Sequence, residues 1–177
     1  MSSLADDLLA LGYHELFQRM STAAMDTLWA ESHEALEALI MDSSSPNRAR
    51  FLAAEICFHK TPGFAATASR EVLAEIYAQA LETSATGNPW ALPGFYTGES
   101  GQHLLQIGDP AAEALLPLLQ IERQLAYEGS EEATVGSKYG FRVKDLAAFF
   151  IARLRGIPYT AHRERAMRDA FIRKLEE

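Results

Sequence analysis

One stretch of the sequence, residues 146–154, is apolar around almost its whole circumference when it is read as a helix. Its side chains are Leu, Ala, Phe and Ile, and only Arg153 interrupts them. A helix that has almost no polar face must be covered by neighbouring elements on most of its sides. We therefore expect a central, buried helix over about residues 141–155, which ends before Pro158 and has other elements packed around it.

Elsewhere, apolar residues recur three and four positions apart, and no stretch sustains the alternating pattern of a β-strand. The 177 residues are close to the size of one domain, and 48% of them are hydrophobic, which is enough for a sizeable core. The expected fold is all-α, and Pro117 is placed to kink the sixth helix. Caps, prolines and glycines divide the chain into about eight expected helices: 3–20, 22–40, 46–60, 69–81, 100–107, 109–119, 141–155 and 162–175.

An internal repeat relates two parts of the chain. Residues 48–81 align without a gap with residues 142–175, so that Arg48 falls on Arg142 and the Leu-Ala-Ala triplet at 52–54 falls on the triplet at 146–148. The shift from 48 to 142 is twice a spacing of 47 residues, which is at the upper end of helical-repeat periods. An irregular copy over 100–119 fits between them, and such hairpins stack because one alone cannot bury both faces.

Turn residues with Asp, Pro and Arg precede three of the expected helices. They are Asp42, Pro46 and Arg48 before "LAAEI", Gly108-Asp109-Pro110 before "AAEALLPLL", and Arg142-Val143-Lys144-Asp145 before "LAAFFIARL". In these features the chain resembles the HEAT-like helical repeats related to the bacterial PBS-lyase HEAT-like repeats. The resemblance covers about residues 34–177 and departs from the family in its long loops and irregular middle copy. It implies a short α-solenoid that acts as a scaffold or binds a partner, although some members act on nucleic acid or modify chromophores.

On this basis we expect one helical-repeat domain over 1–177, built of stacked antiparallel hairpins. It would comprise an N-terminal hairpin (1–42), a repeat (43–83), an irregular repeat with a long loop (84–127) and a C-terminal repeat (128–177).

The charge is uneven along the chain. Sixteen Lys and Arg against 24 Asp and Glu give a net charge of −8, of which residues 1–141 carry 7 − 19 = −12 and residues 142–177 carry 9 − 5 = +4. The net negative field disfavours nucleic acid, which stays a weak alternative through the basic C-terminal helices. The asymmetry also permits head-to-tail self-association that salt would weaken. The basic side chains concerned are Arg153, Arg155, Arg163, Arg165, Arg168 and Arg173.

Two long connections, 83–101 and 128–139, are the candidate functional loops. A loop this long in a compact domain is usually functional or disordered, and the aromatic residues of the first loop argue for order. In a two-helix repeat, alternate loops gather at one edge, together with helix N-termini that favour anions. We therefore predict a binding pocket there from Trp90, Tyr96, Tyr139 and Arg142. The alternative is structural: the aromatic rings cover the middle repeat, and Arg142 pairs with a neighbouring acid.

Signals of catalysis are weak. Glu99 and His103 are the acid–base candidates if the same loop pocket belongs to an enzyme or to a small-ligand binding protein. Cys57 lies on an apolar helix stripe, which indicates a buried hydrophobic residue rather than a nucleophile. His33 and Glu37 share a helix face, but two ligands do not complete a metal site. No cofactor, metal or catalytic residue is expected.

The sequence therefore predicts a non-catalytic interaction module or scaffold that binds another protein through its long-loop edge. The six residues predicted at that edge are Trp90, Tyr96, Glu99, His103, Tyr139 and Arg142. The longest apolar runs are too short to span a bilayer, and the acidic start lacks the basic region of a secretory signal, so a cytoplasmic location is expected.

Overall fold

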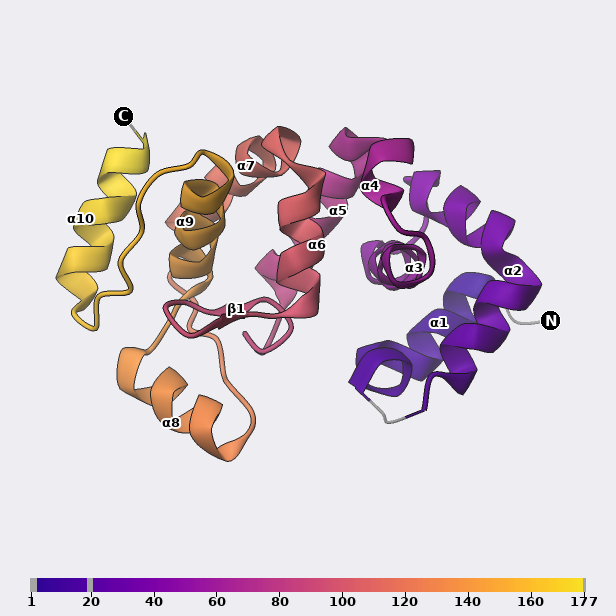
Figure 1. Ribbon diagram of the computed structural model, residues 1–177, viewed down its shortest axis with the longest axis horizontal. Coiled ribbons are helices and arrows are strands. Elements are labelled where there is room, and N and C mark those ends of the chain that lie inside the picture. Colours follow the sequence, from indigo (N-terminus) through magenta and orange to yellow (C-terminus); the bar gives the residue numbers. More distant parts are fainter. Residues whose placement is uncertain (1–2, 19–20, 177) are drawn as a thin grey trace. The chain divides into compact units, whose positions relative to one another are not determined.

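The structure is a computed structural model that describes residues 3–18 and 21–176. As expected, the fold is all-α: the described residues form ten α-helices and one small antiparallel hairpin, β1–β2 (Figure 1). A π-helical turn, His14–Gln18, follows α1, and a 3-10 helix, Leu116–Gln120, follows α7. The other elements are α1 (Leu4–Tyr13), α2 (Ala23–Met41), α3 (Asn47–Lys60), α4 (Phe64–Thr67), α5 (Arg70–Thr83), β1 (Ala91–Leu92), β2 (Tyr96–Thr97), α6 (Glu99–Ile107), α7 (Asp109–Leu115), α8 (Ser130–Tyr139), α9 (Val143–Leu154) and α10 (Arg165–Glu176).

The chain divides into two compact units, unit 1 (Met1–Ile76) and unit 2 (Tyr77–Glu177), and the boundary falls within α5. This division is coarser than the four hairpin segments expected from the sequence. None of the helices in the described ranges combines the length and the apolar character that crossing a membrane requires.

Unit 1 is built around α3, which packs against α1 and α2 and is seen end-on in Figure 1. Every residue of α3 from Ala49 to Phe58 is buried. Pro46 is the N-cap of this helix, one position before the expected first turn. An ion pair between Lys60 at the end of α3 and Asp26 of α2 joins the two helices outside the core.

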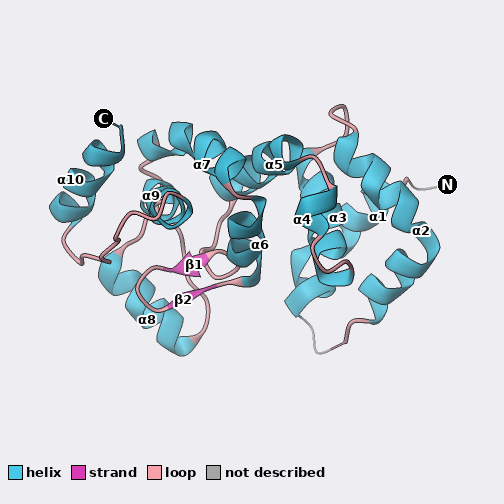
Figure 2. Cartoon of the chain, turned by 45° about the horizontal axis from the view of Figure 1, so that its top comes forward, coloured by secondary structure: helices cyan, strands magenta, loops and turns pink. Residues whose placement is uncertain are grey.

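Unit 2 is built around α9, the helix expected to be buried, and this expectation is confirmed. Nine of its 12 residues are buried, and it packs against α6, α7, α10 and the 3-10 helix (Figure 2). The segment after α7 changes from α to 3-10 geometry at Leu116, immediately before Pro117. That change agrees with the expected effect of the proline, which lacks an N–H for the ladder.

Two predicted connections contain structure of their own. Residues 128–139, expected as a loop, contain the helix α8, and the loop 83–101 contains the β1–β2 hairpin. Strands of two residues are too short to show an alternating pattern, so no sequence period could reveal this hairpin. The four-residue α4, which follows Gly63, lies where the sequence predicts only a connection between two helices.

Tyr127 attaches the two loop regions to each other. Its hydroxyl donates to the carbonyl oxygen of Ala91 at 2.7 Å, and its ring fills the space between Gly87 and Gly136. A Cβ atom at Gly87 or Gly136 would lie 2.3 or 2.4 Å from this ring, so only glycine permits the contact. The hairpin and α8 are therefore fixed side by side within unit 2.

Candidate functional site

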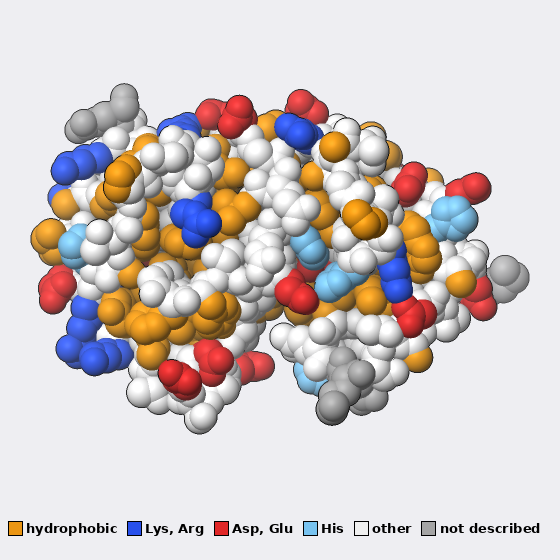
Figure 3. Space-filling model, viewed as in Figure 1, with side chains coloured by type: hydrophobic (Ala, Val, Ile, Leu, Met, Phe, Trp, Pro, Cys, Tyr) orange, Lys and Arg blue, Asp and Glu red, His pale blue; other side chains and the backbone are white. Residues whose placement is uncertain are grey.

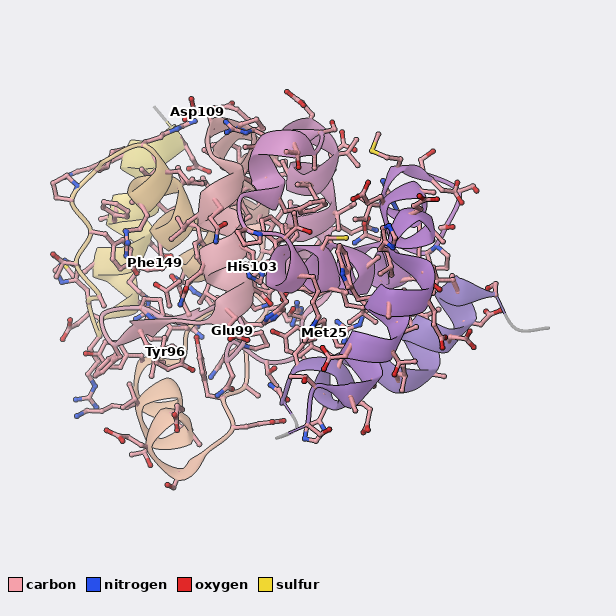
Figure 4. The ribbon with its side chains drawn as sticks, turned by 45° about the vertical axis from the view of Figure 1, so that its right-hand side comes forward. Met25, Tyr96, Glu99, His103, Asp109 and Phe149 are labelled. Atoms are coloured by element: carbon pink, nitrogen blue, oxygen red, sulfur yellow. The ribbon has the colours of Figure 1, made fainter. Side chains whose placement is uncertain are left out.

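Unit 2 contains an open groove of about 510 Å³ beside the β-hairpin, which we call the hairpin groove. Its three walls are the hairpin, α9 and the connection between α9 and α10. Figure 4 shows Tyr96 on the hairpin and Phe149 on α9, and hydrophobic side chains gather over the hairpin in Figure 3. The lining residues are Gly94, Phe95, Tyr96, Thr97, Phe149, Arg153, Ile157, Pro158, Tyr159 and Ala161.

The wall opposite the hairpin is a chain of aromatic rings. Phe149 meets Tyr159 edge to face at 5.3 Å between ring centroids, and Tyr159 meets Phe171 of α10 in the same way at 5.4 Å. Burial raises the pKa of Tyr159, and the charge of Asp145 adds to this effect. The phenol is therefore neutral at physiological pH and offers the groove a rigid, amphipathic ring.

The hairpin wall is supported from behind by a second set of rings. Phe95 packs edge to face on Tyr139 at 5.9 Å, and Tyr139 stacks on Phe141 at 5.1 Å. Gly94 turns the hairpin with a φ of 87°, and a Cβ atom added there would lie 2.8 Å from the Cβ of Ala161. The hairpin thus closes tightly onto the α9–α10 connection at this end of the groove.

Tyr96 is half-buried in the groove wall. Burial raises the pKa of its hydroxyl and nearby Glu132 raises it further, against a smaller opposing effect of a hydrogen bond with Asn88. Asn88 also pairs with the backbone of Glu128 at 2.8 Å in both directions, which ties the hairpin loop to the start of α8. Tyr96 is therefore a neutral side chain held at the edge nearest an acidic helix end.

Arg153 is the cation of the groove. Its guanidinium carbon lies 5.7 Å from the centroid of the Phe149 ring, a distance at which a cation and a ring attract. Its side chain is exposed, and it makes no ion pair within residues 3–18 and 21–176. Arg155, two residues later, is paired instead with Glu113 at 2.8 Å.

A buried carboxylate, that of Asp145, organises the N-terminus of α9. The backbone N–H and Nε of Arg142 both donate to Asp145 Oδ2 at 2.9 Å, and Arg142 Nη2 donates to Oδ1 at 2.9 Å. Arg168 of α10 lies 3.2 Å from the same carboxylate and donates to the carbonyl oxygens of His162 at 2.8 Å and Tyr139 at 3.0 Å.

This network continues to the surface and fastens α10. Arg142 donates to Asp169 and to Glu122, each at 2.7 Å, and Lys144 reaches Glu122 at 2.5 Å and Asp169 at 3.1 Å. Hydrogen bonds from Lys144 and Arg142 lower the pKa of Glu122. Burial alone would raise the pKa of Asp169, but the same two donors outweigh it and hold that pKa below its usual value. We call the six side chains the α10 clamp: Glu122, Arg142, Lys144, Asp145, Arg168 and Asp169.

The six predicted site residues do not form one pocket. Tyr96 lines the hairpin groove and Tyr139 supports it, whereas Trp90 and Arg142 are each only 1% exposed. Trp90 donates from Nε1 to Ser84 Oγ at 2.8 Å and meets Tyr77 edge to face at 6.2 Å. Arg142 pairs with neighbouring acids in the clamp. Trp90 and Arg142 therefore make structural contacts, which the sequence allowed as the alternative to a binding pocket.

Glu99 and His103 lie one turn apart on α6 (Figure 4). Glu99 is exposed and His103 is 9% exposed, and neither lines any cavity described within the residues that the structure covers.

Cys57 is fully buried, and burial raises the pKa of its thiol to about 12, with a further contribution from Glu37. The described ranges also hold no group of three His, Cys, Asp or Glu side chains that could bind a metal ion.

The basic residues considered for nucleic acid have different environments. Arg168 is buried in the clamp, Arg155 is paired with Glu113 and Arg153 lines the groove. Arg163, Arg165 and Arg173 are exposed on or just before α10.

Sequence reasoning missed most of the groove. The helical pattern predicts only the end of a helix at this connection, although Ile157 and Tyr159 place two large apolar side chains next to Pro158. The sequence predicts Phe149 in the buried helix and Arg153 among the basic residues of the C-terminal helices. The usable signal was the same as for the first loop: aromatic and apolar residues beside Gly and Pro, outside the helical period.

No protein-family model matches the chain, and no curated protein or solved structure is similar enough to it to indicate a relationship.

Proposed function

We propose that the protein is a non-catalytic interaction module that binds a segment of a partner protein in the hairpin groove. The observation that carries this proposal is the exposure of two large apolar side chains on opposite walls of the groove. Phe95 is 56% exposed and Ile157 is 37% exposed. Apolar side chains gathered at a groove mark interaction sites, and aromatic residues are enriched in interfaces.

The groove is also preorganised. Its rings are locked by edge-to-face and stacked contacts on both walls, and the α10 clamp holds the helix that supports Tyr159. A wall that is already ordered loses little conformational entropy when a partner binds. This supports recognition of a specific segment rather than adaptive contact with many surfaces.

The proposed relationship to HEAT-like repeats points to the same function, because that family implies scaffolding or partner binding. Supporting it, the aligned pairs Leu52 and Leu146, Ile56 and Phe150, and Cys57 and Ile151 are all fully buried. The groove residues come from the first long loop, from α9 and from the connection after α9. The proposed binding surface is therefore narrower than the predicted loop edge on the hairpin side, and it adds Phe149, Arg153 and residues 157–161.

Photo-crosslinking tests the proposal. The cross-linkable residue p-benzoylphenylalanine replaces Phe95 in one protein and Met167 in a matched control, since Met167 is 49% exposed but lies outside the groove. After irradiation in lysate, the partner peptide attached to each position is identified by mass spectrometry. We expect one partner segment at position 95, its loss when Ile157→Asp is added, and no such product at position 167.

Equal products at positions 95 and 167, or a product at position 95 that survives Ile157→Asp in a folded protein, would show that the groove is not the binding site.

A small-ligand binding protein is the second candidate, and the size of the groove favours it. A volume of about 510 Å³ lies in the range of 300–1,000 Å³ that is usual for ligand pockets. Native mass spectrometry of the purified protein separates the two candidates: a bound small molecule that is absent from the Ile157→Asp variant would favour this second function.

A further inference from the structure

Resting on the proposed function, the geometry points to the chemistry of the bound segment: we infer that it carries an Asp or Glu side chain next to a large apolar side chain. The apolar residue lies between Phe95 and Ile157, and the carboxylate meets Arg153. The occupant is a segment of a partner protein, not a nucleic acid and not a free small molecule.

The apolar part of the inference follows from the two facing walls. Phe95 and Ile157 are exposed, and Phe149, Pro158 and Tyr159 extend the apolar surface between them. A side chain such as Leu or Phe would bury these surfaces on insertion, which is favourable in proportion to the apolar area removed from water. Glycine or alanine would leave most of that area in contact with solvent.

The carboxylate of the bound segment is inferred from the unpaired charge of Arg153. Its neighbour Arg155 has a carboxylate partner, but Arg153 has none in the described part of the chain, and its guanidinium is aimed across an aromatic face. Arg163 and Arg165 follow the groove residue Ala161 closely, are exposed, and likewise form no ion pair with any described residue. A carboxylate is the group that complements a guanidinium both in charge and in planar geometry.

The charges near the hairpin wall and on the α9 wall also orient the segment. Tyr96, at the hairpin side, lies within the influence of Glu132 on α8, which repels an anion. The cation that lines the groove, Arg153, lies on the α9 wall. The acidic residue of the ligand therefore binds towards α9, and its apolar neighbour binds towards the hairpin.

A panel of four fluorescein-labelled peptides tests this inference by fluorescence polarisation against the full chain. The first has capped Gly-Ser arms around Glu-Leu-Phe, the second has Gln in place of Glu, the third has Lys there, and the fourth has Glu-Ala-Ala. We expect the first peptide to bind best, the Gln peptide to bind about fivefold more weakly and the Lys peptide more weakly still, since a partly exposed ion pair contributes a modest factor. The Glu-Ala-Ala peptide should show no measurable binding.

Variants of the protein test whether Arg153 contacts the carboxylate of the peptide. Arg153→Gln is expected to weaken the Glu peptide to the level of the Gln peptide, whereas the matched change Arg155→Gln leaves it unchanged. Arg153→Glu is expected to reverse the preference, so that the Lys peptide binds better than the Glu peptide. A merely structural role for Arg153 cannot produce that reversal.

The possible failures are distinguishable. Equal binding of the Glu and Gln peptides, with no effect of Arg153→Gln, would overturn the acidic preference and leave the proposed function standing. No binding by any peptide to the folded chain would overturn both. Stronger binding of N-acetylphenylalanine or of a labelled oligonucleotide than of the Glu peptide, with competition at the groove, would assign it to a small molecule or a nucleic acid instead.

Discussion

The central helices of the two units, α3 and α9, share an apolar pattern but differ at their N-termini. Leu52, Ala53 and Ala54 of α3 are all buried, as are the aligned Leu146, Ala147 and Ala148 of α9. The aligned arginines before these residues have opposite environments. Arg48 is exposed and lies 6.0 Å from the ring of Phe51, whereas Arg142 is buried among three carboxylates.

The same apolar helical pattern is therefore combined with two different environments at the helix N-terminus. In unit 1 the first turn of α3 leaves Arg48 exposed, while the buried Arg50 donates from Nε to the carbonyl oxygen of Ile40 at 3.0 Å. In unit 2 the first turn is a polar network that fixes α10, and α10 carries Phe171 against the groove residue Tyr159. The groove therefore depends on a contact that unit 1 lacks at the aligned position.

The largest predicted effect separates the two arginines. Arg142→Ala leaves the buried carboxylate of Asp145 without its main partner, and the loss of one member of a buried ion pair costs about 3–5 kcal/mol. Arg48→Ala removes an exposed side chain and should change the free energy of unfolding by less than about 0.5 kcal/mol. Urea unfolding followed by circular dichroism measures both variants. Similar values for the two would mean that the clamp does not stabilise unit 2.

A second pair of changes tests the similarity of the two helices rather than their difference. Leu52→Ala and Leu146→Ala each empty a fully buried position, and each should cost about 2–5 kcal/mol. Hydrogen exchange with mass spectrometry reports where stability is lost. We expect the amides of α3 to lose protection in the first variant and those of α9 in the second. A cost below about 1 kcal/mol at either site would contradict the equivalence of the two buried faces.

The helices of the fold could be predicted because their signals are local. The apolar run at 146–154, the caps near Asp109 and the break at Gly156 each act within one or two turns, and the structure confirms the helices that they define. The hairpin and α4 could not be predicted, since two-residue strands and a single helical turn show no period. The prediction of a loop over residues 128–139 was wrong for another reason. The helix α8 is held by the packing of Tyr127 on Gly136, and a local sequence pattern does not reveal that contact.

The candidate site was predictable only in part. Aromatic residues in the first long loop correctly indicated an ordered loop, and Tyr96 lines the groove. Sequence could not distinguish Trp90, whose ring is buried on Tyr77, from Phe95, whose ring is exposed, because both lie in the same loop within two residues of a proline. Burial at such positions is decided by contacts between distant segments, and those depend on the finished fold.

A smaller effect is predicted for the outer part of the clamp and for its dependence on pH. Asp169→Asn weakens the contacts with Arg142 and Lys144, and because Asp169 is 30% exposed we expect a cost of about 1 kcal/mol at neutral pH. The pKa of Asp169 is lower in the folded protein, so its stabilisation is complete above the ordinary pKa of 3.8 and is lost as the pH falls through the folded value.

Unfolding of the wild type and of Asp169→Asn at a series of pH values checks this sign. The difference between them should be constant from pH 7 to about pH 5 and should shrink towards about pH 3. A difference that grows on acidification would contradict the ion-pair role. The same variant should weaken the Glu-Leu-Phe peptide slightly, because a less firmly held α10 supports Tyr159 less well.

The smallest expected effect is a difference in thiol reactivity between the two units. Cys57 in α3 aligns with Ile151 in α9, both fully buried, and a thiol with a pKa of about 12 reacts only when its surroundings open. We expect Cys57 in the wild type, and the thiol of Ile151→Cys in a Cys57→Val background, to resist Ellman's reagent at pH 8 until the helix around each opens. Adding Arg142→Ala should accelerate the reaction at position 151 far more than at position 57, since the clamp lies in unit 2 and holds the N-terminus of α9. Equal acceleration at both positions would show instead that the two units open as one, and the contrast between α3 and α9 would then have no separate energetic meaning.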